Sequence, residues 1–224
     1  MNKFKHLIVN LFLGYFPKNF LGEDHLTIIS NYYPKGDLFN FIHQNQVDNT
    51  TRQIIFVGIS YGMKYLHQMN IVHRDLKLSN ILIDDDLHPH ITYFNFFPTN
   101  DSGAIIAKPI YLAPEIIEGK HFESSADVYS FGFLMYEVIT GKQSSLDGAN
   151  TSYQVFLKST EGVRPEIPSF VKKPIKDMID RCWSCDPDNR PTFDELFQKL
   201  AYDPNFLLDD VDTEKLNSYI DMIK

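Results

Sequence analysis

The 224-residue sequence is poor in cysteine and contains no long apolar run. Its two cysteines, Cys182 and Cys185, are too few for a disulfide framework, so the expected location is the cytoplasm. No second pair or histidine partner follows their C-x-x-C spacing, and a zinc or redox site is therefore not expected. No stretch approaches the roughly 18 to 20 apolar residues that cross a bilayer, so no membrane span is predicted.

Basic residues are also in the minority. The sequence has 21 lysines and arginines against 29 acidic residues, for a net charge of −8. This balance argues against a nucleic-acid-binding surface or a surface for anionic membranes. The apolar fraction of 43% and the charged fraction of 22% are typical of a globular protein, and the length suits one compact domain, or one domain and a fragment.

Two apolar runs near the N-terminus predict strands at 7–16 and 26–33. The first run loosely resembles a secretory signal, but Asn10 interrupts it and no small-residue cleavage site follows. We therefore interpret it as a buried strand. Further along the chain we expect short strands at 71–72 and 81–83, turns at 84–86 and 88–90, and irregular structure over 93–115.

Helical periodicity dominates the rest of the chain. Apolar residues recur at three- and four-residue steps within 51–69, with Asn49 and Thr50 as capping candidates. Residues 124–140 are apolar on all sides, which predicts a helix buried through the centre of the domain. Ser124 with Asp127 resembles a capping box, and Gly141 suits the C-terminal cap. Shorter helices are predicted at 38–43, 153–159, 173–182, 192–200 and 213–222.

One polar loop combines a carboxylate, a lysine and an asparagine: His73-Arg74-Asp75-Leu76-Lys77-Leu78-Ser79-Asn80. It resembles the protein-kinase catalytic loop H-R-D-L-K-x-x-N at every defined position. Phosphoryl transfer depends mainly on positioning and on charge stabilisation, which these residue types supply. The resemblance implies that Asp75 accepts the substrate hydroxyl proton, Lys77 neutralises the γ-phosphate and Asn80 holds a magnesium ion. Lysine at this place is the serine/threonine-kinase form.

Other stretches resemble the kinase scaffold. Ala113-Pro114-Glu115 matches the end of the activation segment, and Arg190 matches the arginine that forms a buried ion pair with that glutamate. The resemblance implies that Asp127 binds the catalytic-loop backbone. It also implies that His73 belongs to the internal hydrophobic spine and that Arg74 pairs with a phosphorylated activation segment.

The resemblance further implies an adenine site and a subgroup. Residues 29–34 resemble the hinge, which would bring Ser30, Asn31, Tyr32 and Leu82 around adenine. Arg181-Cys182-Trp183 and Arg190-Pro191 resemble the tyrosine-kinase-like group. The expected class is α+β with a protein-kinase-like fold. We expect remnant small-lobe strands and the hinge at 1–33, a mostly helical large lobe at 34–200, and a helical tail at 201–224.

Three departures from the kinase pattern bear on activity. The sequence begins just before the fourth small-lobe strand, so it shows neither G-x-G-x-x-G nor the V-A-I-K lysine. The D-F-G position reads Tyr93-Phe94-Asn95, and a phenol cannot replace a carboxylate on magnesium. Asp84 lies too far along a strand to substitute. Finally, Lys108 stands where a threonine would contact Asp75 and Lys77.

These observations leave three hypotheses. The first is a catalytically impaired pseudokinase or interaction module, in which binding of ATP and magnesium is weak or absent. The second is an active ATP-dependent protein serine/threonine kinase, as part of a longer chain. The third is a truncated product that does not fold stably by itself. All three imply a protein partner or protein substrate, and the open remnant strands predict self-association.

Overall fold

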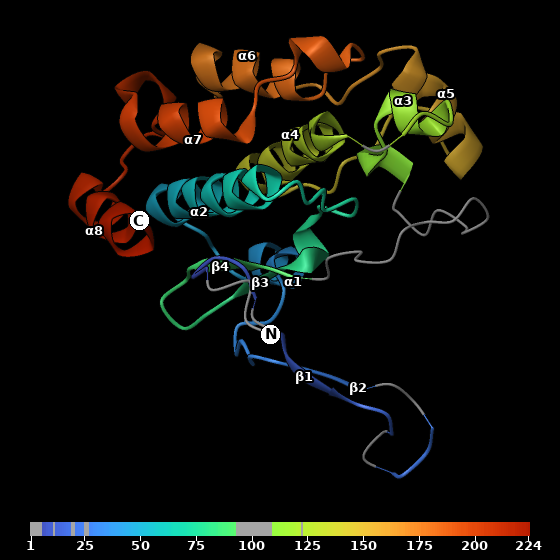
Figure 1. Cartoon of the computed structure of the whole chain (residues 1–224). Helices are drawn as coiled ribbons and strands as arrows, with labels where there is room; N and C mark the ends of the chain where they lie inside the picture. The colour runs from blue at the N-terminus through green and yellow to red at the C-terminus, as the bar shows by residue number, and fades with distance from the viewer. Residues whose placement is uncertain (1–5, 11, 19–20, 25–26, 93–108, 122) are drawn as a thin grey trace.

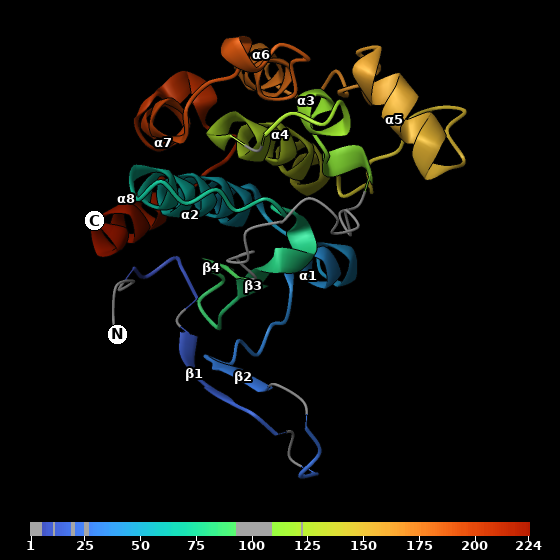
Figure 2. The ribbon, with the colours of Figure 1, turned by 45° about the vertical axis from the view of Figure 1, so that its right-hand side comes forward.

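A computed structural model describes residues 6–10, 12–18, 21–24, 27–92, 109–121 and 123–224. Within them the chain forms a helical body and two separate, two-stranded antiparallel sheets. Figure 1 and Figure 2 both show the β1–β2 hairpin extending away from the helices, while the β3–β4 hairpin lies against them. This arrangement confirms the predicted α+β class and its mostly helical large lobe.

The central helix α4 spans Ser124–Thr140 and is buried on all sides, as its sequence predicts. Its left-handed C-terminal cap is Gly141, with φ of 65°, a conformation that glycine adopts without steric strain. The predicted capping box was wrong. The N-cap is Glu123, which makes no side-chain bond to the helix, and Asp127 instead contacts the loop at residues 73–80.

Helix α2 spans Asn49–Gln68 and lies beside α4, α7 (Phe193–Tyr202) and α8 (Thr213–Ile223) (Figure 1). Its N-cap is Asp48, whose carboxylate accepts a bond from the Thr51 N–H at 2.6 Å. The capping candidates Asn49 and Thr50 were therefore wrong. Three adjacent polar residues could each serve as a cap, and the extended backbone at Asp48 selects that residue.

The remaining helices follow the sequence pattern closely: α1 Leu38–Gln44, α5 Ser152–Thr160 and α6 Lys173–Cys182. The region predicted as irregular is ordered at its described end, with a 3-10 turn η2 at Pro109–Tyr111 and α3 at Pro114–Ile117. Pro114 starts α3 because its ring fixes φ near the helical value. The predicted strand at 71–72 is absent: the Ile71 N–H bonds to the Leu66 carbonyl at 2.9 Å and closes the end of α2.

The two hairpins differ from the predicted strands. Strand β1 is Phe12–Phe16, paired with β2 at Thr27–Ser30, and Leu13, Tyr15 and Phe16 are each more than half exposed. The prediction of a buried strand over 7–16 was thus wrong for this part, because nothing in the described chain covers the two-stranded sheet. Ile8, Val9 and Asn10, which precede β1, are buried.

The second hairpin joins β3 (Ile81–Ile83) to β4 (Pro89–Ile91). Residues 88–90 were predicted as a turn, but Pro89 and His90 belong to β4. The turn itself is held by Asp84, whose Oδ1 accepts bonds from the N–H groups of Asp86 and His88.

Candidate active site

The loop at residues 73–80 is anchored by a buried carboxylate from α4. Asp127 Oδ2 accepts a hydrogen bond from the His73 N–H at 2.8 Å, and its Oδ1 accepts one from the Arg74 N–H at 2.9 Å. Asp127 is 1% exposed. Arg74 has φ of 69°, a left-handed conformation that is uncommon outside glycine. The two bonds to Asp127 hold this strained backbone and so fix the direction in which the next residue leaves.

The three residues predicted to carry the chemistry lie together. Lys77 Nζ lies 2.8 Å from Asp75 Oδ2. Asn80 Nδ2 donates to the Asp75 carbonyl at 2.7 Å and to Asp75 Oδ2 at 2.8 Å. Since the turn η1 (Leu78–Asn80) folds the chain back on itself, Asn80 reaches the residue five positions before it. The Asp75 side chain is a quarter exposed, so a substrate group has access to it.

Strand β4 is fastened to this loop at Thr92. The Thr92 N–H donates to the Asn80 carbonyl at 3.0 Å, and the His73 ring Nε2 lies 3.0 Å from the Thr92 carbonyl. The Asp75 N–H approaches His73 Nδ1 at 3.3 Å. A carbonyl only accepts and an N–H only donates, so these contacts assign a neutral ring protonated at Nε2. Burial agrees with this assignment, because it lowers the pKa of His73.

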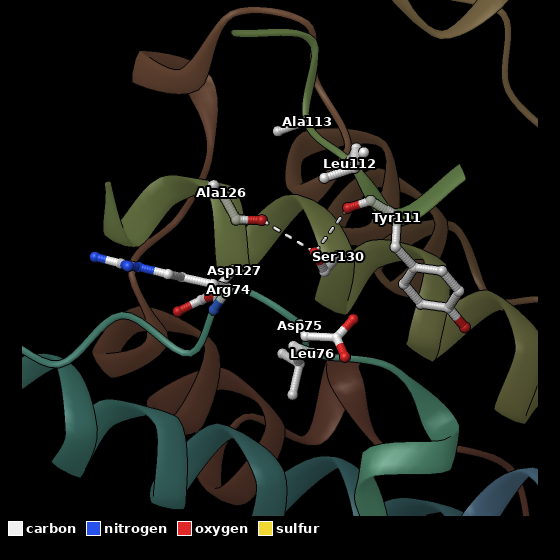
Figure 3. A pocket seen from close by; sticks show the side chains of 9 residues that line it. All are labelled: Arg74, Asp75, Leu76, Tyr111, Leu112, Ala113, Ala126, Asp127 and Ser130. Carbon is white, nitrogen blue, oxygen red and sulfur yellow. Dashed lines mark hydrogen bonds between the residues drawn. The ribbon is translucent and has the colours of Figure 1, made fainter. Parts of the chain in front are cut away.

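A small hollow opens beside the loop (Figure 3). The backbone of the segment after residue 108 forms its other wall, where Ser130 Oγ donates to the Tyr111 carbonyl at 2.8 Å. The Tyr111 hydroxyl donates to buried Glu137 at 2.5 Å, and burial raises the pKa of Tyr111 well above its ordinary value. The sequence reasoning missed this contact. Tyr111 and Glu137 lie 26 residues apart, and no spacing rule connects them.

The pair of Glu115 and Arg190 joins α3 to the C-terminal helices. Arg190 binds Glu115 in a bidentate manner at 2.6 and 2.8 Å, and the Arg190 side chain is fully buried. Its guanidinium also donates to the Ser184 and Ser125 carbonyls at 2.9 and 3.0 Å. The donors of this buried cation are therefore largely satisfied, which the low polarity of the interior requires.

A family model for protein tyrosine and serine/threonine kinases matches residues 1–200. The chain belongs to the protein kinase family. It is 31% identical over 208 residues to serine/threonine-protein kinase STY17 of Arabidopsis thaliana, a match that covers 89% of this chain and 35% of the relative. STY46 of the same plant is 30% identical, with the same two coverages. A probable serine/threonine-protein kinase of Dictyostelium discoideum is 32% identical over 78% of this chain and 13% of its own. This kinase domain thus spans about a third of the length of its plant relatives.

The predicted adenine-binding residues do not gather around one cavity. Asn31 and Tyr32 line a cavity of about 630 Å³, together with residues that include His6 and Asp84. Neither Ser30 nor Leu82 lines this cavity. Ser30, Asn31 and Tyr32 are exposed, and Tyr32 is 86% accessible. Leu82 is half-buried in β3, where it pairs with His90.

Among the described residues of this kinase domain, no three histidine, cysteine or acidic side chains lie together around a point that could hold a metal ion. The Asn80 side-chain amide donates hydrogen bonds to Asp75. Its side-chain oxygen is the atom that could bind a metal ion. Asp84 Oδ2 is held by His90 at 2.9 Å. Tyr93, Phe94, Asn95 and Lys108 lie outside the described residues.

Within the described part of the chain, no helix is both long enough and apolar enough to cross a bilayer.

Proposed function

We propose that this kinase domain is impaired in magnesium-dependent phosphoryl transfer and acts as a protein-interaction module. The observation that carries the proposal is the attachment of Thr92 to both His73 and Asn80. The residue that follows Thr92 in the sequence is Tyr93, at the position where the family resemblance implies the magnesium-binding aspartate. The attachment supports that assignment because it fixes the register of the chain directly before residue 93.

The chemistry of tyrosine supports impairment. A phenol has a pKa near about 10 and is neutral at pH 7, whereas magnesium prefers charged carboxylate oxygens. Metal ions supply several kcal/mol of charge stabilisation to phosphoryl transfer. Each ~1.4 kcal/mol corresponds to a tenfold change in rate, so we expect a deficit of at least about a hundredfold.

The second candidate function is an active protein serine/threonine kinase that transfers the γ-phosphate of ATP to protein hydroxyls. The contacts among Asp75, Lys77 and Asn80 favour it, since the three residues that the family resemblance assigns to the transfer already lie together. The relatives named as serine/threonine kinases favour the same specificity. In either case we infer a protein partner or substrate.

The finer placement rests on sequence resemblance. Arg181-Cys182-Trp183 and Arg190-Pro191 support the tyrosine-kinase-like group. The cysteine content supports a cytoplasmic location. We propose three parts of the chain: the small-lobe remnant at 1–33, the large lobe at 34–200 and the tail at 201–224. The exposed apolar side chains of the β1–β2 hairpin support self-association through the first part.

A transfer assay separates the two candidates. The purified chain is incubated with radiolabelled ATP, magnesium and a generic basic protein, with Asp75→Ala as the inactive control. We expect incorporation at the level of that control. Tyr93→Asp tests the stated cause, and we expect incorporation to rise above the wild-type level. Wild-type incorporation well above the Asp75→Ala level would establish the active kinase instead.

A melting experiment tests the nucleotide site independently of turnover. Ligand at a hundred times its Kd stabilises a protein by about 2.7 kcal/mol, which melting curves resolve. We expect millimolar ATP to cause a small shift that magnesium does not change. A large shift that needs magnesium would contradict the proposed loss of the metal ligand.

A further inference from the structure

The C-terminal tail, residues 201–224, lies beyond the part of the chain that the kinase family model matches. Its helix α8 packs against α2 and lies near one end of it in Figure 1. Four of its side chains are at most 5% exposed and recur at three- and four-residue steps, which gives α8 a single buried face: Leu216, Tyr219, Ile220 and Ile223. The tail is therefore an integral part of the folded body.

The first turns of α2 are adapted to receive this tail. The side chain of Gln53 is fully buried and bonds both to the end of α7 and to the segment between α7 and α8. Its Nε2 donates to the carbonyls of Leu200 and Phe206, and its Oε1 accepts from the Leu208 N–H at 3.1 Å. Thr50 Oγ1 accepts from the Asp212 N–H at 2.9 Å. Detachment of the tail would break the bonds of Gln53 to Phe206 and Leu208 and the bond of Thr50 to Asp212.

Two glycines one turn apart on α2 form the contact surface farther along the helix. A Cβ at Gly58 would overlap the Tyr219 hydroxyl of α8 and would lie 2.6 Å from Pro89 Cγ of β4. A Cβ at Gly62 would lie 2.7 Å from Ile91 Cδ1. Strand β4 and the Tyr219 side chain thus pack against the same face of α2, the face that carries Gly58 and Gly62. The Tyr219 ring also contacts the His88 ring, with centroids 4.6 Å apart.

We propose that α8 is a positioning element for the catalytic loop. The Tyr219 hydroxyl and Pro89 both lie over Gly58, and the Tyr219 ring contacts His88 directly before β4, so α8 restrains the start of β4 on α2. Strand β4 leads directly into Thr92, whose backbone is bonded to Asn80 and His73. Release of α8 would free β4 at its start and loosen the register of the chain before residue 93. This role does not depend on whether the domain transfers phosphate.

Amide hydrogen exchange on the full chain tests the proposal. The Ile91 and Thr92 N–H groups, bonded to the Ile8 and Asn80 carbonyls, report on β4. For Tyr219→Ala we expect their exchange to accelerate at least about tenfold, while amides in α6 change less than about twofold. Met222→Ala, on the exposed face of the same helix, is the matched control and should leave both sets unchanged. Unchanged exchange at Ile91 and Thr92, or equal acceleration throughout, would overturn the proposal.

A double-mutant cycle provides a second test that does not require removal of the ring. Gly58→Ala should accelerate exchange at Ile91 and Thr92, because the added methyl group meets both the Tyr219 hydroxyl and Pro89 of β4. In a Tyr219→Phe background the same substitution should have a smaller effect, since the hydroxyl is gone. An equal effect in the two backgrounds would show that the contact does not hold β4.

Discussion

The Glu115–Arg190 and Asp75–Lys77 pairs join similar groups at similar distances but differ in burial. The first pair is 2.6 Å apart with its arginine fully buried, and the second is 2.8 Å apart with both side chains more than a fifth exposed. A buried charge loses its hydration and depends on its partner, whereas an exposed one keeps water as an alternative. Burial therefore assigns one pair to the scaffold and leaves the other available to a substrate.

The largest expected effect comes from breaking the buried pair. Arg190→Ala should lower the free energy of unfolding by about 3–5 kcal/mol, because it leaves the Glu115 carboxylate buried without its partner. Urea unfolding followed by the fluorescence of Trp183, the one tryptophan of the sequence, measures this. Arg181→Ala is the matched control, since the Arg181–Glu195 pair is 2.7 Å long but exposed, and should cost less than about 1 kcal/mol. Similar losses in both variants would break the comparison.

Histidines provide a second test of how burial affects charge, because a histidine can lose its proton when it is buried. Burial lowers the pKa of His73 and His88, and lowers that of His6 to about 4. Between the unfolded value of 6.5 and these lower values the unfolded chain binds more protons, so stability falls as pH falls through this window. From pH 7 to pH 5 we expect a loss of about 1–2 kcal/mol, with the His6 part reduced because its ring is partly exposed.

Urea unfolding at the two pH values checks this expectation. His6→Gln should flatten the dependence on pH, since glutamine does not titrate. A variant that keeps the full wild-type dependence would show that His6 contributes nothing to it.

A smaller effect is expected at the half-buried pair. Asp75→Asn should change the free energy of unfolding by less than about 0.5 kcal/mol, since water reaches the pair with Lys77 and the new amide still accepts from Asn80. The same unfolding assay measures it. A loss as large as that of Arg190→Ala would remove the distinction between scaffold and chemistry.

The smallest effect on stability is expected in the β1–β2 hairpin, whose exposed side chains are apolar and not charged. Replacing Leu13 and Phe16 together by serine should leave the free energy of unfolding nearly unchanged, because both side chains are more than half exposed. Light scattering should show association of the wild-type chain and its loss in the variant. A wild-type chain that is a monomer at the highest concentration tested would contradict the self-association proposal.

Local patterns in the sequence accounted for most of the helices. The span of α6 agrees residue for residue with its prediction, and α8 differs by one residue, because helical periodicity and capping act over neighbouring positions. The failures were local too. At 71–72 an apolar pair was taken for a strand, although it closes the end of α2. Two apolar residues suit either structure, and the surroundings decide between them.

Some contacts of the candidate site could be predicted from the sequence and others could not. The loop residues are within eight positions of one another, so the motif itself indicated that Asp75, Lys77 and Asn80 meet. The contacts of Asp127 with His73 and of Arg190 with Glu115 span 54 and 75 residues, and only the family resemblance indicated them. Nothing in the sequence indicated that Tyr111 meets Glu137 or that Gly58 accommodates Tyr219.

The sequence by itself determined the chemical groups and the helices, because residue identity and periodicity are properties of neighbouring positions. It also determined that tyrosine stands at position 93. The tertiary structure decided which charges lose their water, since burial depends on segments far apart in the chain. It placed Arg190 in the interior and Lys77 at the surface, although both are cations beside a carboxylate. It also decided that α8 reaches β4, because only the packed helices bring Gly58 and Tyr219 together.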